Sequence, residues 1–228
     1  MHFSPARLGF SLMEIALALV IIGLTVGGVL VGQEMLRNSE VRSVITEYQG
    51  FQRATDLFVQ QYEYLPGDLP TAGGTNGFWP VIAQTGTADN GDGDGNIDIG
   101  GSYEDLLAWR ELALAELIPG SYTGAPNGAS PDIYNIGSNI PAAKLPGAGW
   151  AFFNTLWVAG KTGNATLDGG VLTAEEARSI DNKIDDTDPT NGTVIGADGD
   201  GTSCISGSAY FTPFDGILRC YVGFVTGY

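Results

Sequence analysis

The sequence predicts an α+β protein, in which a long N-terminal membrane-spanning helix continues into a globular head with short helices and an antiparallel sheet. Three observations predict this architecture. An apolar run of membrane length lies near the N-terminus, an amphipathic stretch with helical spacing follows it, and the remainder is rich in Gly, Asn and Asp with only short helix and strand patterns. The expected divisions are a leader at 1–9, a membrane-spanning helix at 10–32, its amphipathic continuation at 33–64 and a soluble α+β head at 65–228.

The apolar run is long enough to cross a bilayer. Between Phe10 and Val31 the only ionisable side chain is Glu14. A helix over these residues would be roughly 33 Å long, at about 1.5 Å per residue, which spans the hydrocarbon core of a membrane. No A-x-A-like cleavage site follows the run, as it would after a secretory signal peptide. We therefore expect the apolar segment to be retained.

Glu14 is unusual because it lies inside this run. A carboxylate in hydrocarbon costs about 2.5–3.5 kcal/mol on insertion scales, so we expect it to be neutralised or paired, and an acid in this position marks a function by default. The alternative is an incidental acid near a helix N-terminus, which the helix dipole favours by up to about 1 kcal/mol.

The residues around Glu14 carry a family resemblance. GFSLME, residues 9–14, resembles the cleavage and methylation signature of type IV prepilins and of the pseudopilins of type II secretion. The resemblance implies that a membrane-bound prepilin peptidase/methyltransferase cuts between Gly9 and Phe10 and methylates the new N-terminus. The freed ammonium group of Phe10 in a neighbouring subunit would then be the partner of Glu14, and the pair would set the register of subunits in a filament.

The resemblance also implies a function. The chain would be a pilin-like structural subunit of a type IV pilus or of a type II secretion pseudopilus, and not an enzyme. Its partners would be other pilin or pseudopilin subunits, the prepilin peptidase/methyltransferase, the inner-membrane assembly machinery and the membrane. Its single N-terminal helix would hold it in the inner (cytoplasmic) membrane, with the head in the periplasm or outside, until it enters a filament. Two alternatives are a minor tip subunit with an adhesive or ligand-binding head, and a membrane-anchored hydrolase.

Charge and histidine content exclude several classes of function. The chain has 10 Lys and Arg against 26 Asp and Glu, with a formal net charge of −16. Nucleic-acid binding needs clustered Lys and Arg, so we expect no nucleic-acid partner. The only histidine, His2, lies in the leader, so the processed chain would lack Ser-His and Cys-His catalysis and histidine metal sites.

The amphipathic continuation should pack one face on the head. The residues expected on this face recur at three- and four-residue steps: Val41, Val44, Ile45, Tyr48, Phe51, Thr55, Phe58, Val59 and Tyr62. The helix should end near Tyr64, because Pro66 disfavours a helical conformation at Leu65. Pro66 and Gly67 fit the centre of a type II turn.

Two short helices are expected in the head. Residues 100–120 contain an apolar face and end in Pro-Gly, and Ser102 with Asp105 forms a capping pattern at the start. Thr173 with Glu176 opens the second helix in the same way.

The C-terminal part of the head carries strand patterns and both cysteines. Residues 149–160, 208–212 and 217–225 predict strands, of which the last two should form a hairpin. Cys204 and Cys220 are an even pair in a chain expected to be exported, which predicts a disulfide. The alternative is two buried thiols. Closing this loop would contribute about 3 kcal/mol on the chain-entropy estimate.

Residues 89–98, DNGDGDGNID, resemble a calcium-binding loop. Read from Asn90, the loop has oxygen side chains at positions one, three, five and nine, the turn glycine Gly95 at six and a backbone carbonyl at seven. Gly101 occupies position twelve in place of a bidentate glutamate, so an acid from the following helix would have to complete the shell. The predicted calcium ligands are Asn90, Asp92, Asp94, Asn96, Asp98 and Glu104. The alternative is a solvated turn, since Asp, Asn and Gly dominate turns for backbone reasons alone.

Overall fold

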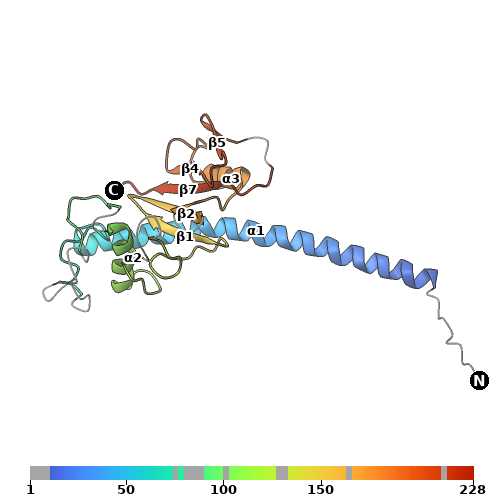
Figure 1. Cartoon of the computed structure of the whole chain (residues 1–228), viewed down its shortest axis with the longest axis horizontal. Helices are drawn as coiled ribbons and strands as arrows, with labels where there is room; N and C mark the ends of the chain where they lie inside the picture. The colour runs from blue at the N-terminus through green and yellow to red at the C-terminus, as the bar shows by residue number, and fades with distance from the viewer. Residues whose placement is uncertain are drawn as a thin grey trace, which may run out of the picture. The chain divides into compact units, whose positions relative to one another are not determined.

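The computed structural model describes residues 11–73, 77–79, 90–99, 103–126, 133–162, 166–211 and 215–228. It confirms the α+β class, with a long apolar N-terminal helix followed by a head that contains short helices and an antiparallel sheet (Figure 1). By its internal contacts the chain forms two compact units, Met1–Glu40 and Val41–Tyr228.

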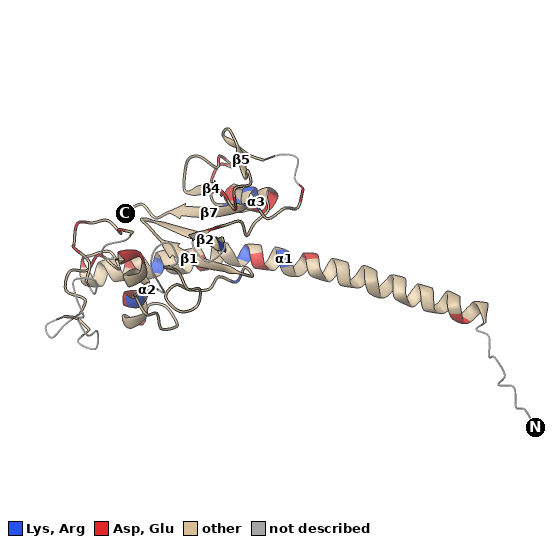
Figure 2. Cartoon of the chain, viewed as in Figure 1, with Lys and Arg blue, Asp and Glu red and all other residues tan. Residues whose placement is uncertain are grey.

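Helix α1, Leu12–Tyr62, is 51 residues long and joins the segments expected at 10–32 and 33–64 without a break. In the first unit, residues 11–31 are all exposed. Among the described residues α1 is the one helix that is long and apolar enough to cross a membrane. The first part of α1 is almost free of charge (Figure 2).

In the second unit, α1 packs one face against the head, as its spacing predicts. The fully buried residues of this face are Val41, Val44, Tyr48, Ala54, Thr55 and Phe58, and the partly buried ones include Ile45, Phe51, Val59 and Tyr62. The helix ends two residues earlier than expected. Beyond it, the N–H of Asp68 donates to the carbonyl of Leu65 at 3.2 Å, and Gly67 has a φ of +92°, which matches the predicted type II turn.

The head contains a five-stranded antiparallel sheet with the order β1-β2-β7-β4, in which β3 also pairs with β2. A separate two-stranded ladder joins β5 and β6. The strands are β1 (Ala148–Phe152), β2 (Thr155–Thr162), β3 (Thr166–Gly169), β4 (Val194–Asp198), β5 (Ile205–Ser206), β6 (Ala209–Tyr210) and β7 (Cys220–Val225).

The hairpin expected between residues 208–212 and 217–225 is wrong. Strand β6 pairs instead with β5 across a tight turn in which Gly207 has a φ of +66°, a conformation that glycine adopts without strain. Strand β7 lies between β2 and β4, where Cys220, Val222 and Phe224 are fully buried. A central position buries these apolar side chains, which a short peripheral hairpin with β6 would not do.

The two short helices begin differently. Helix α3, Ala174–Ile184, has the predicted capping box: the Thr173 hydroxyl accepts from Glu176 N–H at 3.2 Å, and the Glu176 carboxylate accepts from Thr173 N–H at 2.9 Å. Helix α2, Glu104–Leu114, begins after Tyr103, which is left-handed and makes no side-chain cap. The cap predicted at Ser102 is therefore wrong in position, and Ser102 itself lies outside the described residues.

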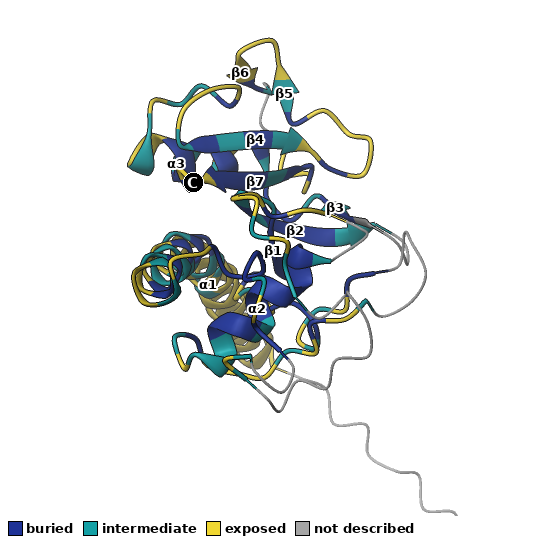
Figure 3. Cartoon of the chain, turned by 90° about the vertical axis from the view of Figure 1, so that its left-hand side faces the viewer, coloured by how far each residue is buried: buried dark blue, intermediate teal, exposed yellow. Residues whose placement is uncertain are grey.

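Aromatic side chains join α1 to α2 and the sheet. Tyr48 stacks on Phe224 with ring centroids 4.3 Å apart, and Phe51 makes edge contacts with Trp109 at 5.0 Å and with Trp150 at 5.4 Å. Helix α2 and the main strands are largely buried (Figure 3). This core fixes the ends of the elements from which the polar loops of the head project.

Candidate functional site

Asp68 lies outside the loop at residues 90–98, the Asp/Gly-rich loop, and its side chain binds the backbone of this loop. Its side chain is buried, and one carboxylate oxygen accepts the N–H groups of Gly93 at 2.7 Å and Asp94 at 3.1 Å. The other oxygen accepts the N–H of Gly95 at 2.9 Å. A single carboxylate therefore satisfies three successive backbone donors of a loop that has little regular structure of its own.

Glu104 holds the same loop from α2. It is fully buried, and its two carboxylate oxygens accept the N–H groups of Asp92 at 3.1 Å and Asp98 at 2.9 Å. The expectation that Glu104 lies at the loop is correct. Both of its oxygens accept backbone N–H groups, as those of Asp68 do, so the contact that the structure shows holds the loop backbone in place.

The predicted side-chain ligands of the loop separate into two sets. Asn90 turns toward the preceding segment, where its side-chain oxygen accepts the N–H of Gly73 at 2.8 Å. Asp92 and Asp94 form short-range turns, in which Asp92 accepts from Asp94 N–H at 3.1 Å and Asp94 accepts from Asn96 N–H at 2.7 Å. Both aspartates remain exposed.

Three carboxylates of this region come together. Asp68, Asp92 and Asp94 each offer an oxygen, and these oxygens lie within 4.8 Å of one another. Calcium takes six to eight oxygen ligands at about 2.3–2.6 Å, so carboxylates at this spacing fit a hard divalent cation whose shell water completes. Asp98 and Glu104 do not belong to this group among the described residues. Sequence reasoning missed Asp68, which lies in the turn after α1 and has no loop-motif signal.

Burial is the main cause of the raised pKa values in this region, and neighbouring like charges add to it. Burial raises the pKa of Asp68, which the backbone hydrogen bonds from the loop oppose and the charge of Asp94 reinforces. Burial also raises the pKa of Glu104, with further contributions from Asp92 and Asp68. A bound cation would relieve this repulsion.

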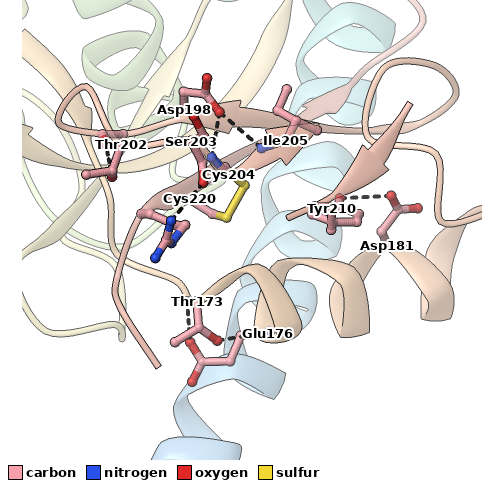
Figure 4. Close-up of a disulfide and its surroundings, with 12 residues drawn as sticks. Thr173, Glu176, Asp181, Asp198, Thr202, Ser203, Cys204, Ile205, Tyr210 and Cys220 are labelled. Atoms are coloured by element: carbon pink, nitrogen blue, oxygen red, sulfur yellow. Dashed lines mark hydrogen bonds between the residues drawn. A yellow bond between two sulfur atoms is a disulfide. The ribbon is translucent and has the colours of Figure 1, made fainter. Parts of the chain in front are cut away.

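A second group of acids, which includes Asp181 and Asp185, lies at the end of α3 and binds neighbouring segments of the chain. Asp181 is buried and accepts from the Tyr210 hydroxyl at 2.8 Å (Figure 4). It also accepts from Thr187 N–H at 3.0 Å. Asp185 accepts the N–H groups of Thr193 and Val194 at the start of β4. These carboxylates act as hydrogen-bond acceptors within the fold.

The predicted disulfide between Cys204 and Cys220 is present, and both cysteines are fully buried (Figure 4). Asp198 accepts the N–H groups of Cys204 at 2.6 Å and Ile205 at 3.1 Å, which fixes the chain at the first cysteine. Arg219, next to the second cysteine, donates to the carbonyl of Ser203 at 3.2 Å.

The N-terminal site is described only in part. Gly9 and Phe10 lie outside the described residues. Glu14 closes a capping box at the start of α1: its carboxylate accepts Ser11 N–H at 2.8 Å, and the Ser11 hydroxyl accepts Glu14 N–H at 3.4 Å. Sequence reasoning missed this contact, although Ser-x-x-Glu before an apolar run is the usual signal for it.

Comparison of the chain with protein-family models, with curated proteins and with solved structures found no match.

We predict that Asp68→Asn destabilises the head by about 2 kcal/mol, the scale of a hydrogen bond to a charged group. The amide would place a donor opposite one of the three loop N–H groups and would carry no charge. Asp98→Asn, an exposed change in the same loop, is the matched control. Urea unfolding of residues 41–228 in the presence of a chelator measures both variants, and equal stabilities would contradict the prediction.

Proposed function

We propose that the chain is a pilin-like structural subunit, anchored in the inner membrane by the N-terminal part of α1 and assembled into a filament after cleavage by a prepilin peptidase. The observation that carries this proposal is the sequence GFSLME at residues 9–14, which opens an exposed apolar stretch at residues 11–31 whose only acid is Glu14. Apolar surface of this extent requires lipid or other protein chains to cover it. A type IV pilus and a type II secretion pseudopilus both meet this requirement.

The proposed role of Glu14 combines a local and an intermolecular contact. Within its own chain it caps α1 through Ser11. In a bundle of apolar helices its charge would also need a cationic partner, because an unpaired charge in such surroundings is strongly penalised. The methylated ammonium group of Phe10 from the next subunit would supply that partner and fix the stagger between subunits.

In this proposal the head has a structural role. Asp68, Glu104 and Asp181 are buried acids whose oxygens accept hydrogen bonds from the fold, so they hold loops in place. The part of the chain after the leader contains no histidine. The partners that follow from a pilin-like role are other pilin or pseudopilin subunits, the peptidase and the assembly machinery.

We also propose calcium as a stabilising ligand of the head. Asp68, Asp92 and Asp94 would hold the ion, since their oxygens converge, and carboxylates are the ligands that calcium prefers. The ion would join the turn after α1 to the loop at residues 90–98. Glu104 would act beside the site by holding the loop backbone, in place of the ligand role that the sequence predicts.

The first prediction from the proposed function concerns processing. Protein isolated from its native host should begin at Phe10 and carry a methylated amine, because a peptidase that recognises GFSLME cuts after Gly9. Intact mass and N-terminal sequencing measure this directly. Gly9→Val should block cleavage and leave the leader attached. A mature chain that begins at Met1, or one that lacks the apolar run, would rule the proposal out.

The second prediction concerns assembly. Glu14→Val should leave membrane insertion intact or improve it, since the intramembrane charge is removed, and should reduce incorporation into filaments at least tenfold through loss of the charge pair. Glu34→Val, at an exposed position further along α1, is the control and should assemble normally. The amounts of subunit in membranes and in sheared filaments give the two readouts. Wild-type filament levels in the Glu14 variant would contradict the proposed pairing.

The third prediction concerns calcium. Residues 41–228 should melt at a higher temperature with calcium than with chelator, because a ligand bound only by the folded state adds about 2.7 kcal/mol at a hundredfold excess over Kd. Magnesium should have a smaller effect, since it keeps its waters and demands octahedral geometry.

Paired variants locate the calcium site. Asp92→Ala with Asp94→Ala should abolish the calcium shift and leave the disulfide formed, whereas Asp186→Ala with Asp188→Ala should retain the shift. An unchanged shift in the first variant would place calcium elsewhere. No shift in the wild type would leave the loop as turn structure only.

A further inference from the structure

Two Asn-Gly pairs lie wholly in the described part of the chain, and they differ in how the fold holds them. One is Asn90–Gly91 in the Asp/Gly-rich loop, and the other is Asn191–Gly192 in the segment that joins α3 to β4. Asn-Gly is a reactive pair, because glycine has no side chain to keep its backbone nitrogen away from the preceding side-chain amide. The Asn-Gly pairs at 76–77 and 127–128 lie wholly or partly outside the described residues.

The fold holds both reacting groups of Asn90–Gly91. The side-chain oxygen of Asn90 accepts the N–H of Gly73 at 2.8 Å, and the N–H of Gly91 donates to the carbonyl of Leu69 at 3.1 Å. A methyl group added at Gly91 would overlap backbone atoms of Asp68, so this glycine is also closely packed. The nitrogen of Gly91 can therefore approach the Asn90 amide only after local opening of the loop.

Asn191–Gly192 is held more loosely. Both residues are exposed, and in the part of the chain that the structure describes the N–H of Gly192 has no hydrogen-bond acceptor. The side-chain nitrogen of Asn191 donates to the Thr190 hydroxyl at 3.1 Å and to the Asp188 carboxylate at 3.3 Å, and both contacts lie at the surface, where water can replace them. The nitrogen of Gly192 and the amide carbon of Asn191 can thus meet by rotation of one exposed side chain.

The fold requires the glycine of this pair. Gly192 has a φ of +89°, and a methyl group added there would overlap the carboxylate of Asp185. That carboxylate accepts the N–H groups of Thr193 and Val194, so it cannot move away without releasing the start of β4. A larger residue at position 192, which would shield its own backbone nitrogen, is therefore excluded. The reactive pair is a consequence of how α3 is joined to β4.

We propose that Asn191 is a site of spontaneous deamidation, and that its product loosens the junction between α3 and β4. The backbone nitrogen of Gly192 gives up its proton and bonds to the side-chain amide carbon of Asn191. The C–N bond of the side chain breaks, and its nitrogen leaves with that proton as ammonia. Water then adds to the cyclic imide and opens one of its two C–N bonds, which leaves aspartate or isoaspartate. The sum is amide plus water giving acid plus ammonia, with nothing oxidised or reduced.

The product adds a negative charge at a point already rich in acids. The Asn191 amide donates to Asp188, whereas a carboxylate at position 191 would repel it. Isoaspartate also adds a methylene group to the backbone just before Thr193 and Val194, whose N–H groups Asp185 binds. Both effects act against the contacts that place the start of β4. The modification requires neither calcium nor filament assembly.

The test incubates the folded full chain, in detergent micelles with chelator, at mildly alkaline pH in heavy-oxygen water. Peptide mapping by mass spectrometry measures the conversion of each asparagine, and the heavy oxygen marks acid formed before digestion. The peptide with Asn191 should convert about tenfold faster than the peptide with Asn90, whose two hydrogen bonds must open first. In urea the two rates should become similar, since both pairs are then free. Equal rates in the folded chain, or no conversion at Asn191, would overturn the proposal.

A matched variant tests the attacking group. Asn191→Gln keeps the amide but has to close a larger ring, so conversion at position 191 should stop while conversion at Asn90 is unchanged. Conversion of this variant at the wild-type rate would show direct hydrolysis by water and would rule out attack by Gly192.

Hydrogen exchange tests the effect on the junction. The deamidated protein carries one more negative charge, so anion exchange separates it from the unmodified protein. Its amides at Thr193 and Val194 should exchange faster than those of the unmodified protein, while the amides of β7 should keep their protection. Unchanged exchange at these two amides would overturn the proposed loosening. Because chelator is present throughout the incubation, failure here leaves the calcium and filament proposals unaffected.

Discussion

The fold of the head depends on one stripe of α1. From Val41 onward this helix presents buried residues at helical spacing, and Tyr48 and Phe51 place their rings against Phe224 and Trp150 of the sheet. Helix α2 joins the same cluster through Trp109. The stripe therefore supplies the surface on which sheet and helix meet, and the polar loops are placed by the ends of elements that this core has already fixed.

The excess of acids explains how those loops are held. With 26 acidic and 10 basic side chains, most carboxylates have no cation with which to pair. The Gly-rich loops, in turn, leave many backbone N–H groups without partners from a helix or sheet. Asp68, Glu104 and Asp185 meet both needs, since each accepts two or more backbone N–H groups from a loop or from the start of β4. Carboxylates of the head thus serve as hydrogen-bond acceptors for its own backbone. This arrangement places like charges close together.

Sequence reasoning succeeds mainly where the determining pattern is local, although it misplaces the cap of α2 at Ser102 and misses the capping box of Ser11 and Glu14. The stripe of α1, the Thr173–Glu176 capping box, the turn at Pro66 and the disulfide all follow from spacing or from pairing within a short segment. It fails where a residue's partner is distant. The position of β7 and the role of Asp68 depend on contacts between segments far apart in the chain, and no periodicity records them. The predicted calcium ligands come from the loop and from the helix that follows it, and they omit Asp68 for the same reason.

The turn at 65–68 is where these effects converge. Its conformation is local, because Pro66 and Gly67 determine it, but its two polar contacts are not: Gly67 donates to the buried Glu111, and Asp68 accepts from the loop. Both contacts pass through one four-residue turn, in which Gly67 lies close to the backbone of α2. A cation held beside Asp68 would therefore act on a segment that Gly67 already joins to α2, and would tie that segment to the loop as well.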